Sequence, residues 1–451
     1  MNKYLISPVL LTLFLQGCGG GSSSSPEAPV DPVEYTFSLT AQLTNECGVA
    51  SAFTDVELLL QDESWQTLNT YKADDSGVIS FVTTSEFINY TLVAKEQQGS
   101  EAQGLNVVSF YQASSATPSH YQAQFDELID NTSCACISKD IQITHRTFAE
   151  PEENVVTSSL NFNDSRAVGD KATLFEGVKV CRTKEGPWPL SSFSISGTDI
   201  NEKAIAVAKF TDDYEDNVEE ILLLAADEVA DEAMLAMPHQ AFRTNQIIGN
   251  SKHFSTAVSK EDESLLVFRT HSHISAADYQ SQASVTFDER DSVVRSSVVK
   301  TTHQIISTDA QTSFAVKANE ERPPIDDIGI TEIKADGSYD YSAVVGFPMA
   351  VISYTFIAFE PTTKLLMPAK WTFYGQEKGI LAISAPLKGY EKIIDIKTKK
   401  EAIDVQLIRS NNDNYRDYQD YVKYFQGNSR VDMSNDFVKD IDEVILNIKI
   451  N

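Results

Sequence analysis

The sequence predicts a mainly β protein, with an N-terminal antiparallel β-sandwich followed by a larger β-rich region that holds one or two short helices. Three observations support this fold class. Residues 35–44 alternate apolar and polar side chains with a period of two, which is typical of a half-buried strand. Short strand candidates then recur along the chain with turn residues between them, as in sandwiches. Helical features are confined to two segments, 219–237 and 414–426.

The first region, residues 34–145, is predicted to be the sandwich domain. After 35–44, its strand candidates are 56–60, 65–71, 78–82, 87–95, 105–111, 121–125 and 140–144. Turn residues separate them, most clearly Asp74-Asp75-Ser76-Gly77 between the third and fourth strands. Strands this short and this regularly spaced favour two antiparallel sheets packed face to face.

Three stretches of this region also carry a family resemblance. Asp55-Val56-Glu57-Leu58 precedes the turn and strand Ala73–Phe81, and Tyr90-Thr91-Leu92-Val93-Ala94 follows. The order resembles the carboxypeptidase-regulatory or transthyretin-like β-sandwich, in which an Asp-containing turn with a glycine enters a strand. The resemblance covers a quarter of the chain. It implies an accessory or binding module and carries over no catalytic residue.

The remainder of the chain is predicted to be a connector followed by β-rich domains. Residues 146–192 contain loop signals such as Gly186-Pro187-Trp188-Pro189 and are assigned as the connector. Glu320–Pro324 breaks the rest into 193–322 and 323–451, which form two domains or one unit. The strand candidates there are 193–196, 204–210, 265–268, 284–287, 293–299, 304–307, 314–316, 339–345, 351–359, 371–374, 380–384, 393–396, 402–408 and 444–450.

Two segments favour helices. Residues 219–237 are rich in Glu, Ala, Leu and Met and end at Pro238, although their apolar run Ile221–Leu224 would equally suit a buried strand. Residues 414–426 follow an asparagine-rich entry and end at Gly427. The second segment places aromatic rings at helical spacing, namely Tyr415, Tyr418, Tyr421 and Phe425. This stripe is either a face for a partner or glycan, or a face that packs on a sheet.

The amino-terminal residues predict export. Lys3 precedes an apolar run from residue 4 to 15, which is too short to span a bilayer, and small residues follow. The next residues are rich in glycine, serine and proline and should form a flexible tether, residues 18–33. Leu15-Gln16-Gly17-Cys18 resembles the lipobox of bacterial lipoproteins. The resemblance implies cleavage of residues 1–17, acylation of Cys18 and, because Gly19 follows it, the outer membrane, at its periplasmic face or at the cell surface.

Besides the acylated Cys18, the chain has four cysteines: Cys47, Cys134, Cys136 and Cys181. An even number in an exported protein predicts two disulfides, for which three pairings exist. Cys134 and Cys136 lie on the same side of a strand, where a bond between them would be strained. We therefore expect each to pair with a different partner, Cys47 or Cys181. The alternative is a Cys-x-Cys site for a soft metal.

Charge limits the partners. The chain has 65 acidic and 36 basic residues and a formal net charge of −29. A nucleic-acid surface needs stripes of Lys and Arg to meet phosphates, so no nucleic acid is expected. The expected contacts are the membrane, through the lipid anchor, and another envelope protein or a glycan. The acidic balance itself serves solubility or attracts cations.

Two clusters are candidate metal sites. His271 and His273 would share one face of a strand, and neutral imidazoles suit zinc, with Asp262, Asp278, His253 or His303 as a further ligand. The acidic stretch Asp212–Glu220 offers oxygen ligands of the kind that calcium prefers, without EF-hand spacing. Solvated polar surface is the favoured interpretation of both clusters, and no cofactor is the expectation.

No catalytic motif stands out. Ser297-Val298-Val299-Lys300 has the letters of Ser-x-x-Lys but falls in a β-branched run that favours a strand. The sequence therefore predicts a lipid-anchored envelope protein with a non-enzymatic binding or structural role. The alternatives are an envelope hydrolase built from scattered residues such as His271, His273 and Asp278, and a lipoprotein that assists export or assembly of envelope components.

Overall fold

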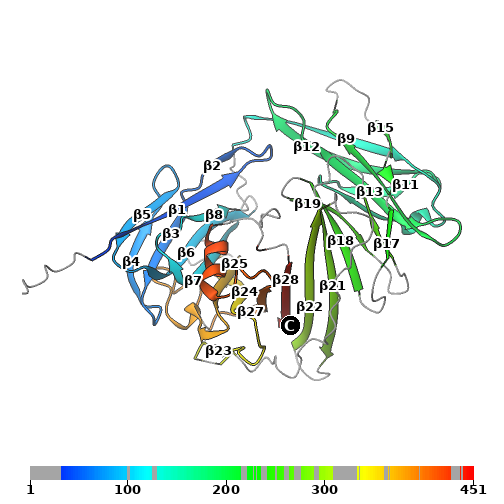
Figure 1. Ribbon diagram of the computed structural model, residues 1–451. Coiled ribbons are helices and arrows are strands. Elements are labelled where there is room, and N and C mark those ends of the chain that lie inside the picture. Colours follow the sequence, from blue (N-terminus) through cyan, green and yellow to red (C-terminus); the bar gives the residue numbers. More distant parts are fainter. Residues whose placement is uncertain are drawn as a thin grey trace, which may run out of the picture.

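The structure of the chain is a computed structural model. It describes residues 32–98, 102–123, 130–214, 221–226, 228–229, 231–234, 241–248, 251–257, 264–268, 276–288, 294–307, 333–334, 336–359, 364, 366–395, 397–427, 437 and 440–450. Within these ranges the protein is mainly β, with several sheets and one α-helix, so the predicted fold class is confirmed. Figure 1 shows two lobes connected by a long sheet.

The first lobe begins with a small sheet in the order β2-β1-β5, with β8 paired in parallel to β1. Its strands are β1 (Tyr35–Thr44), β2 (Ala50–Ala52), β5 (Val78–Thr83) and β8 (Ser119–Ala123). The predicted alternation of β1 is confirmed, because Phe37, Leu39, Ala41 and Leu43 are all buried. These side chains pack against the long sheet and form the inner layer of a sandwich.

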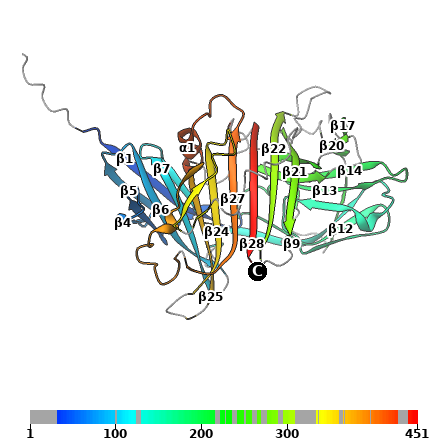
Figure 2. The same ribbon diagram turned by 90° about the horizontal axis from the view of Figure 1, so that it is seen from below.

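The long sheet has twelve strands in the order β19-β18-β21-β22-β28-β27-β24-β25-β7-β6-β3-β4. The strands near the first lobe are β3 (Val56–Gln61), β4 (Thr67–Lys72), β6 (Phe87–Gln98), β7 (Ala102–Ser114), β24 (Met349–Phe359), β25 (Leu366–Gln376), β27 (Lys400–Ser410) and β28 (Asp440–Ile450). The strands toward the second lobe are β18 (Ala241–Ile248), β19 (Ser251–Ala257), β21 (Ala276–Asp288) and β22 (Val294–Ser307). Figure 2 shows β24, β27, β28 and β22 side by side.

One pairing in this sheet is parallel and connects distant parts of the chain. β7 lies beside β25, with Asn106 directly opposite Lys370, and all other pairs are antiparallel. The Trp371 indole donates a hydrogen bond to the Ser109 hydroxyl across this pair, 2.8 Å away and 262 residues apart in sequence. Both groups are buried, so the bond satisfies two polar atoms inside the sheet. The N-terminal strands and the C-terminal region thus share one sheet.

Two hydrophobic clusters cover the two faces of this part of the sheet. One cluster includes the small sheet and the helix α1 (Tyr418–Gly427). The other includes Trp65, Trp371 and the segment 381–394. That side also carries a short two-stranded sheet, β23 (Ser338–Asp340) paired with β26 (Lys378–Ile380), and a 3₁₀ turn at Ala382–Ser384. The first lobe therefore has three layers.

The second lobe contains two four-stranded sheets, in the orders β10-β13-β14-β16 and β11-β12-β9-β15. The strands are β9 (Cys134–Thr144), β10 (Val155–Ser158), β11 (Asp164–Ala167), β12 (Ala172–Thr183), β13 (Ser191–Thr198), β14 (Ala204–Thr211), β15 (Ile221–Ala225) and β16 (Glu228–Val229), with a 3₁₀ turn at Pro151–Glu153. β17 (Asp231–Met234) pairs with β20 (Ser264–Val267). Ile141, Phe175 and Phe193 lie in the core between the two sheets.

The predicted turn at residues 74–77 has a local physical cause. The Asp74 carboxylate accepts hydrogen bonds from the backbone amides of Ser76 and Val78, each 2.9 Å long. Gly77 has a φ of +74°, and a Cβ there would lie 2.4 Å from the Ala41 carbonyl oxygen. Only glycine fits this position.

Strand pairing differs from the predicted ranges in three places. Residues 134–144, placed in the first sandwich, pair with β12 of the second lobe. The predicted connector, 146–192, contains β10, β11 and β12. β25, predicted within 323–451, pairs with β7. The third difference arises because β7 and β25 lie far apart in the chain, so the local sequence of neither strand marks the other as its partner.

One predicted helix is confirmed and the other is wrong. Residues 414–426 were expected to be helical, and α1 spans Tyr418–Gly427. Residues 219–237 instead contain β15, β16 and β17. Leu222 and Leu224 pack against the core of the second lobe while β15 lies parallel to β9, so the short apolar run acts as a strand. Among the residues that the structure describes, no helix has the length and apolar content needed to cross a bilayer.

Candidate functional site

The four cysteines form two disulfides where the two lobes meet. Cys47, in the loop between β1 and β2, is bonded to Cys134 on β9. Cys136, two residues further along β9, is bonded to Cys181, its direct neighbour on β12. The expectation that Cys134 and Cys136 pair with different partners is confirmed. The first disulfide joins the lobes, and the second closes a pair of strands within the second lobe.

Hydrogen bonds surround the first disulfide. The Asn45 side-chain amide donates to the Asp130 carbonyl and to the Ser133 hydroxyl, each 3.1 Å away. The Glu46 backbone amide donates to the Asn131 side chain over 3.2 Å. The loop after β1 is therefore fixed to the start of β9 by both covalent and polar contacts.

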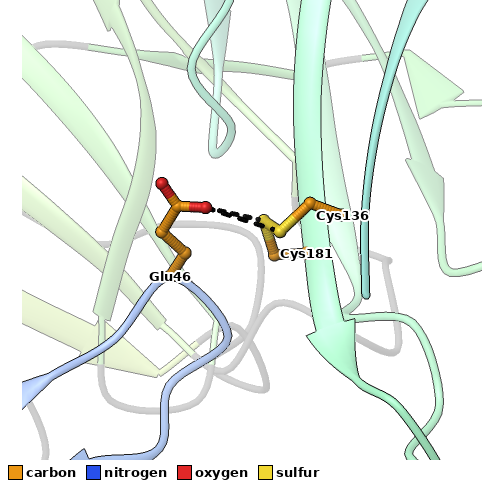
Figure 3. A group of neighbouring side chains, drawn as sticks. All are labelled: Glu46, Cys136 and Cys181. Carbon is orange, nitrogen blue, oxygen red and sulfur yellow. Dashed lines mark hydrogen bonds between the residues drawn. A yellow bond between two sulfur atoms is a disulfide. The ribbon is translucent and has the colours of Figure 1, made fainter. Parts of the chain in front are cut away.

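Glu46 also reaches the second disulfide (Figure 3). Its Oε2 lies 3.5 Å from Cys136 Sγ and 3.6 Å from Cys181 Sγ. In the described part of the chain, these three residues are a group whose ligand atoms come within 4.8 Å of one another. Soft-metal binding requires thiolates, and both sulfurs here are bonded to each other. The oxidised pair therefore does not support the Cys-x-Cys metal alternative.

A cavity of about 210 Å³ opens where β8 covers the long sheet. Its apolar lining is Leu92, Val108, Phe110, Tyr374 and Phe425. Its polar lining is Asn106, His120, Tyr121, Gln122, Lys370 and Thr372. We call it the β7–β25 cavity, because the opposed residues Asn106 and Lys370 bring both strands to it.

A buried carboxylate lies directly behind the polar wall. Glu96, on β6, is only 2% exposed. The Tyr121 hydroxyl donates a short hydrogen bond to Glu96 Oε1, and the Asn106 amide donates to the same oxygen over 3.2 Å. The Asn106 amide also donates to the Tyr121 hydroxyl, 3.0 Å away. The three side chains form a closed polar network in which each buried group has a partner.

The environment keeps Tyr121 protonated. Burial, and next the adjacent Glu96 carboxylate, raise the pKa of Tyr121 far above its ordinary value. The phenol therefore remains protonated, and a hydrogen-bond donor, near neutral pH. Tyr374 has its pKa raised to about 12 by burial alone. Neither phenol is poised to exchange protons near neutral pH.

The aromatic residues of the cavity are held in stacks. The rings of Phe110 and Tyr374 are 4.7 Å apart and nearly parallel, with an interplanar angle of 6°. Phe425 of α1 packs on Tyr374 at 5.3 Å. Stacking against fixed neighbours limits ring motion, so the apolar side of the cavity is preformed.

The tyrosines of the predicted stripe do not form a partner face. Tyr418 and Tyr421 are 6% and 1% exposed and belong to the core under α1. The Tyr418 hydroxyl donates to the Tyr111 carbonyl, and Tyr415 packs edge-on against Phe437. The expectation that these tyrosines form a face for a partner is therefore corrected, because their rings pack α1 against the sheet.

Several predicted site residues lie outside the described residues: Cys18, Asp262, His271, His273 and most of the acidic stretch 212–220. Of the further metal-ligand candidates, His253, Asp278 and His303 fall on β19, β21 and β22 of one sheet. Zinc and calcium stay alternatives to the expectation of no cofactor.

Sequence reasoning missed the lining residues Asn106, Tyr121 and Lys370 and the carboxylate behind them, Glu96. Glu96 follows a predicted strand, and its sequence position predicts an exposed side chain because acidic residues are usually exposed. Lys370 precedes a predicted strand. Nothing local marks either residue, because they are brought together only by the pairing of β25 with β7.

Comparison with known proteins gives little likeness. No protein-family model and no curated protein matches the chain. The crystal structure of the major pilin subunit BcpA of Bacillus cereus is 12% identical, covers 64% of this chain and 96% of the pilin, and has a TM-score of 0.14. The pilus adhesin SpaC from Lactobacillus rhamnosus GG is 8% identical, covers 75% of this chain and 43% of the adhesin, and has a TM-score of 0.13. TM-scores this low carry no argument about fold or function.

Proposed function

We propose that this chain is a lipid-anchored protein of the outer membrane that binds a partner rather than transforming one. The anchoring half of the proposal is supported by Leu15-Gln16-Gly17-Cys18 and by the glycine- and serine-rich residues after it. Several acyl chains on Cys18 would hold the protein stably, whereas one chain anchors only marginally. The lobes then work at the membrane surface, on its periplasmic or outer side.

The proposed binding role is supported chiefly by the burial and hydrogen bonding of Glu96. A general base must be free to accept a proton from a substrate. Glu96 is buried and already accepts hydrogen bonds from Tyr121 and Asn106, so it acts as a fixed acceptor that shapes the wall. The polar residues that line the cavity supply hydrogen-bonding groups, and none of them is a serine or a cysteine. Such a preformed cavity suits recognition.

The anchoring half is tested by Cys18→Ser in the full-length chain, followed by separation of membrane and soluble fractions. We expect wild-type protein in the outer-membrane fraction and the variant in the soluble fraction or as uncleaved precursor. A matched variant, Ser22→Ala in the tether, should fractionate like the wild type. Outer-membrane retention of Cys18→Ser equal to that of the wild type would contradict the anchor.

A further inference from the structure

We propose that the β7–β25 cavity binds a single neutral sugar unit of a glycan. This inference rests on the proposed binding role and adds the chemical class of the ligand. It is carried by the size of the cavity, by the hydrogen-bonding groups of its wall and by its stacked aromatic side.

The size of the cavity selects a small ligand. A volume of about 210 Å³ holds roughly seven water molecules at about 30 Å³ each. Pockets for drug-sized molecules start at roughly 300 Å³. One sugar ring fits the smaller space, and the rest of a glycan would extend into solvent past His120, which is exposed.

The wall offers mixed donors and acceptors, as sugar hydroxyls require. The Lys370 ammonium is a donor, and the Gln122 amide has both a donor and an acceptor end. The Asn106 amide nitrogen is engaged by Glu96 and Tyr121, so its orientation is fixed from behind. Sugar hydroxyls donate and accept at once and can match such a wall, whereas a purely apolar ligand would leave these groups unpaired.

One end of the cavity suits the C–H groups of a sugar ring. Asn106 lies opposite Lys370 and Phe110 lies opposite Tyr374, so the polar and the aromatic lining residues follow one another along the same two strands. Phe110, Tyr374 and Phe425 stack on one another and do not have to reorganise. A sugar ring bound here would place C–H groups against the aromatic residues and hydroxyls toward the polar ones. Preorganisation of both ends reduces the entropic cost of binding.

Other ligand classes fit less well. A divalent cation needs several oxygen ligands. No residue in the described lining carries a carboxylate, Glu96 behind the wall is already engaged, and Lys370 lies in the lining. A nucleotide or another strongly anionic ligand would meet a chain of net charge −29 with a single lysine at the cavity. A neutral polyhydroxylated ring avoids both penalties.

The test is ligand-detected NMR and titration of the folded, disulfide-bonded chain with glucose, galactose, mannose and N-acetylglucosamine. We expect saturable binding of at least one sugar with a Kd on the order of 1 mM. Lys370→Met should weaken it about tenfold, the loss expected for one hydrogen bond to a charged group. Gln122→Leu should also weaken it. Lys388→Met, an exposed lysine outside the cavity, should leave the affinity unchanged.

Two results would overturn the inference: no saturable binding of any of the four sugars by wild-type protein, or binding that Lys370→Met and Gln122→Leu leave intact. Far-ultraviolet circular dichroism of each variant shows whether it folds, and Lys370 is exposed, so its loss should not unfold the lobe. Failure of the proposed function is a separate result. Release of a new product from the bound sugar would support the site while contradicting a non-enzymatic role.

Discussion

Glu46 and Lys179 form an ion pair across the junction of the two lobes, with Oε1 and Nζ 2.6 Å apart although 133 residues separate them in sequence. Their side chains are 40% and 50% exposed. Ion pairs this open to solvent stabilise a fold by only about 0–1 kcal/mol. The covalent bond beside them, Cys47–Cys134, is therefore expected to carry most of the stability of the junction.

Removing that disulfide should be costly. The bond closes a loop of 87 residues, and the loss of such a bond typically lowers the free energy of unfolding by about 2–5 kcal/mol. We expect this loss in the double variant Cys47→Ser/Cys134→Ser, measured by urea denaturation. Lys179→Met should cost less than about 1 kcal/mol. Equal losses of unfolding free energy in the disulfide variant and in Lys179→Met would contradict the claim that the disulfide stabilises the junction more than the ion pair does.

A half-buried ion pair joins β27 and β28. Arg409 donates two hydrogen bonds to Asp442, which is 5% exposed, and its guanidinium lies 5.0 Å from the centre of the Phe347 ring. Arg409→Met would remove a hydrogen-bonded cation from a buried carboxylate, so we expect a loss of about 3 kcal/mol. Arg416→Met, from an exposed pair with Asp413, is the control and should cost under about 1 kcal/mol. Similar losses of unfolding free energy in Arg409→Met and Arg416→Met would contradict the claim that the buried ion pair stabilises the fold more than the exposed one.

Tyr121→Phe tests the network behind the cavity. The change removes the phenolic donor from the buried Glu96 carboxylate and leaves Asn106 as its remaining partner in the network. We expect the free energy of unfolding to fall by about 1–3 kcal/mol. Tyr71→Phe loses only an exposed contact to Asn69 and should change stability by less than about 0.5 kcal/mol. If Tyr121→Phe leaves the free energy of unfolding unchanged, the network does not stabilise the fold.

His145 should make the second lobe sensitive to acid. Burial lowers the pKa of its imidazole, whose nitrogens contact the Arg146 carbonyl at 2.7 Å and the Thr173 hydroxyl at 3.0 Å. A folded-state pKa below the unfolded value of about 6.5 means that the unfolded chain takes up the proton first. The stabilising contribution is thus full above about pH 6.5 and is lost as the pH falls through the folded-state pKa.

The measurement is the free energy of unfolding of wild-type protein and His145→Gln at intervals from pH 7.5 to 4.5. We expect the difference between the two proteins to narrow as the pH falls below about 6.5. A difference that stays constant, or widens toward acid, would show that the imidazole is not held in its neutral form.

Local features of the fold were predictable from sequence, and long-range ones were not. The alternation of residues 35–44 and the Asp74–Gly77 turn depend on neighbouring residues, and both predictions are confirmed. The pairing of β25 with β7 depends on contacts between strands that lie far apart in the chain. The apolar run at Ile221–Leu224 is short enough to suit helix or strand, and only its packing beside β9 decides between them.

In the candidate site, too, local features were predictable from the sequence and long-range contacts were not. The partners of Cys134 and Cys136 could be narrowed from their spacing, because a strand places both side chains on one face. The β7–β25 cavity could not be anticipated, since Glu96, Asn106 and Lys370 come from three strands and only their register brings them together. The tyrosines of α1 had the spacing of a binding stripe, yet their burial against the sheet gives them a structural role.

Mass spectrometry of the amino-terminal peptide from protein purified out of its native membrane tests the central claim most directly. The account predicts a peptide that begins at Cys18 and carries fatty acyl chains. A peptide that begins at another residue, or an unmodified Cys18, would contradict a lipid-anchored protein.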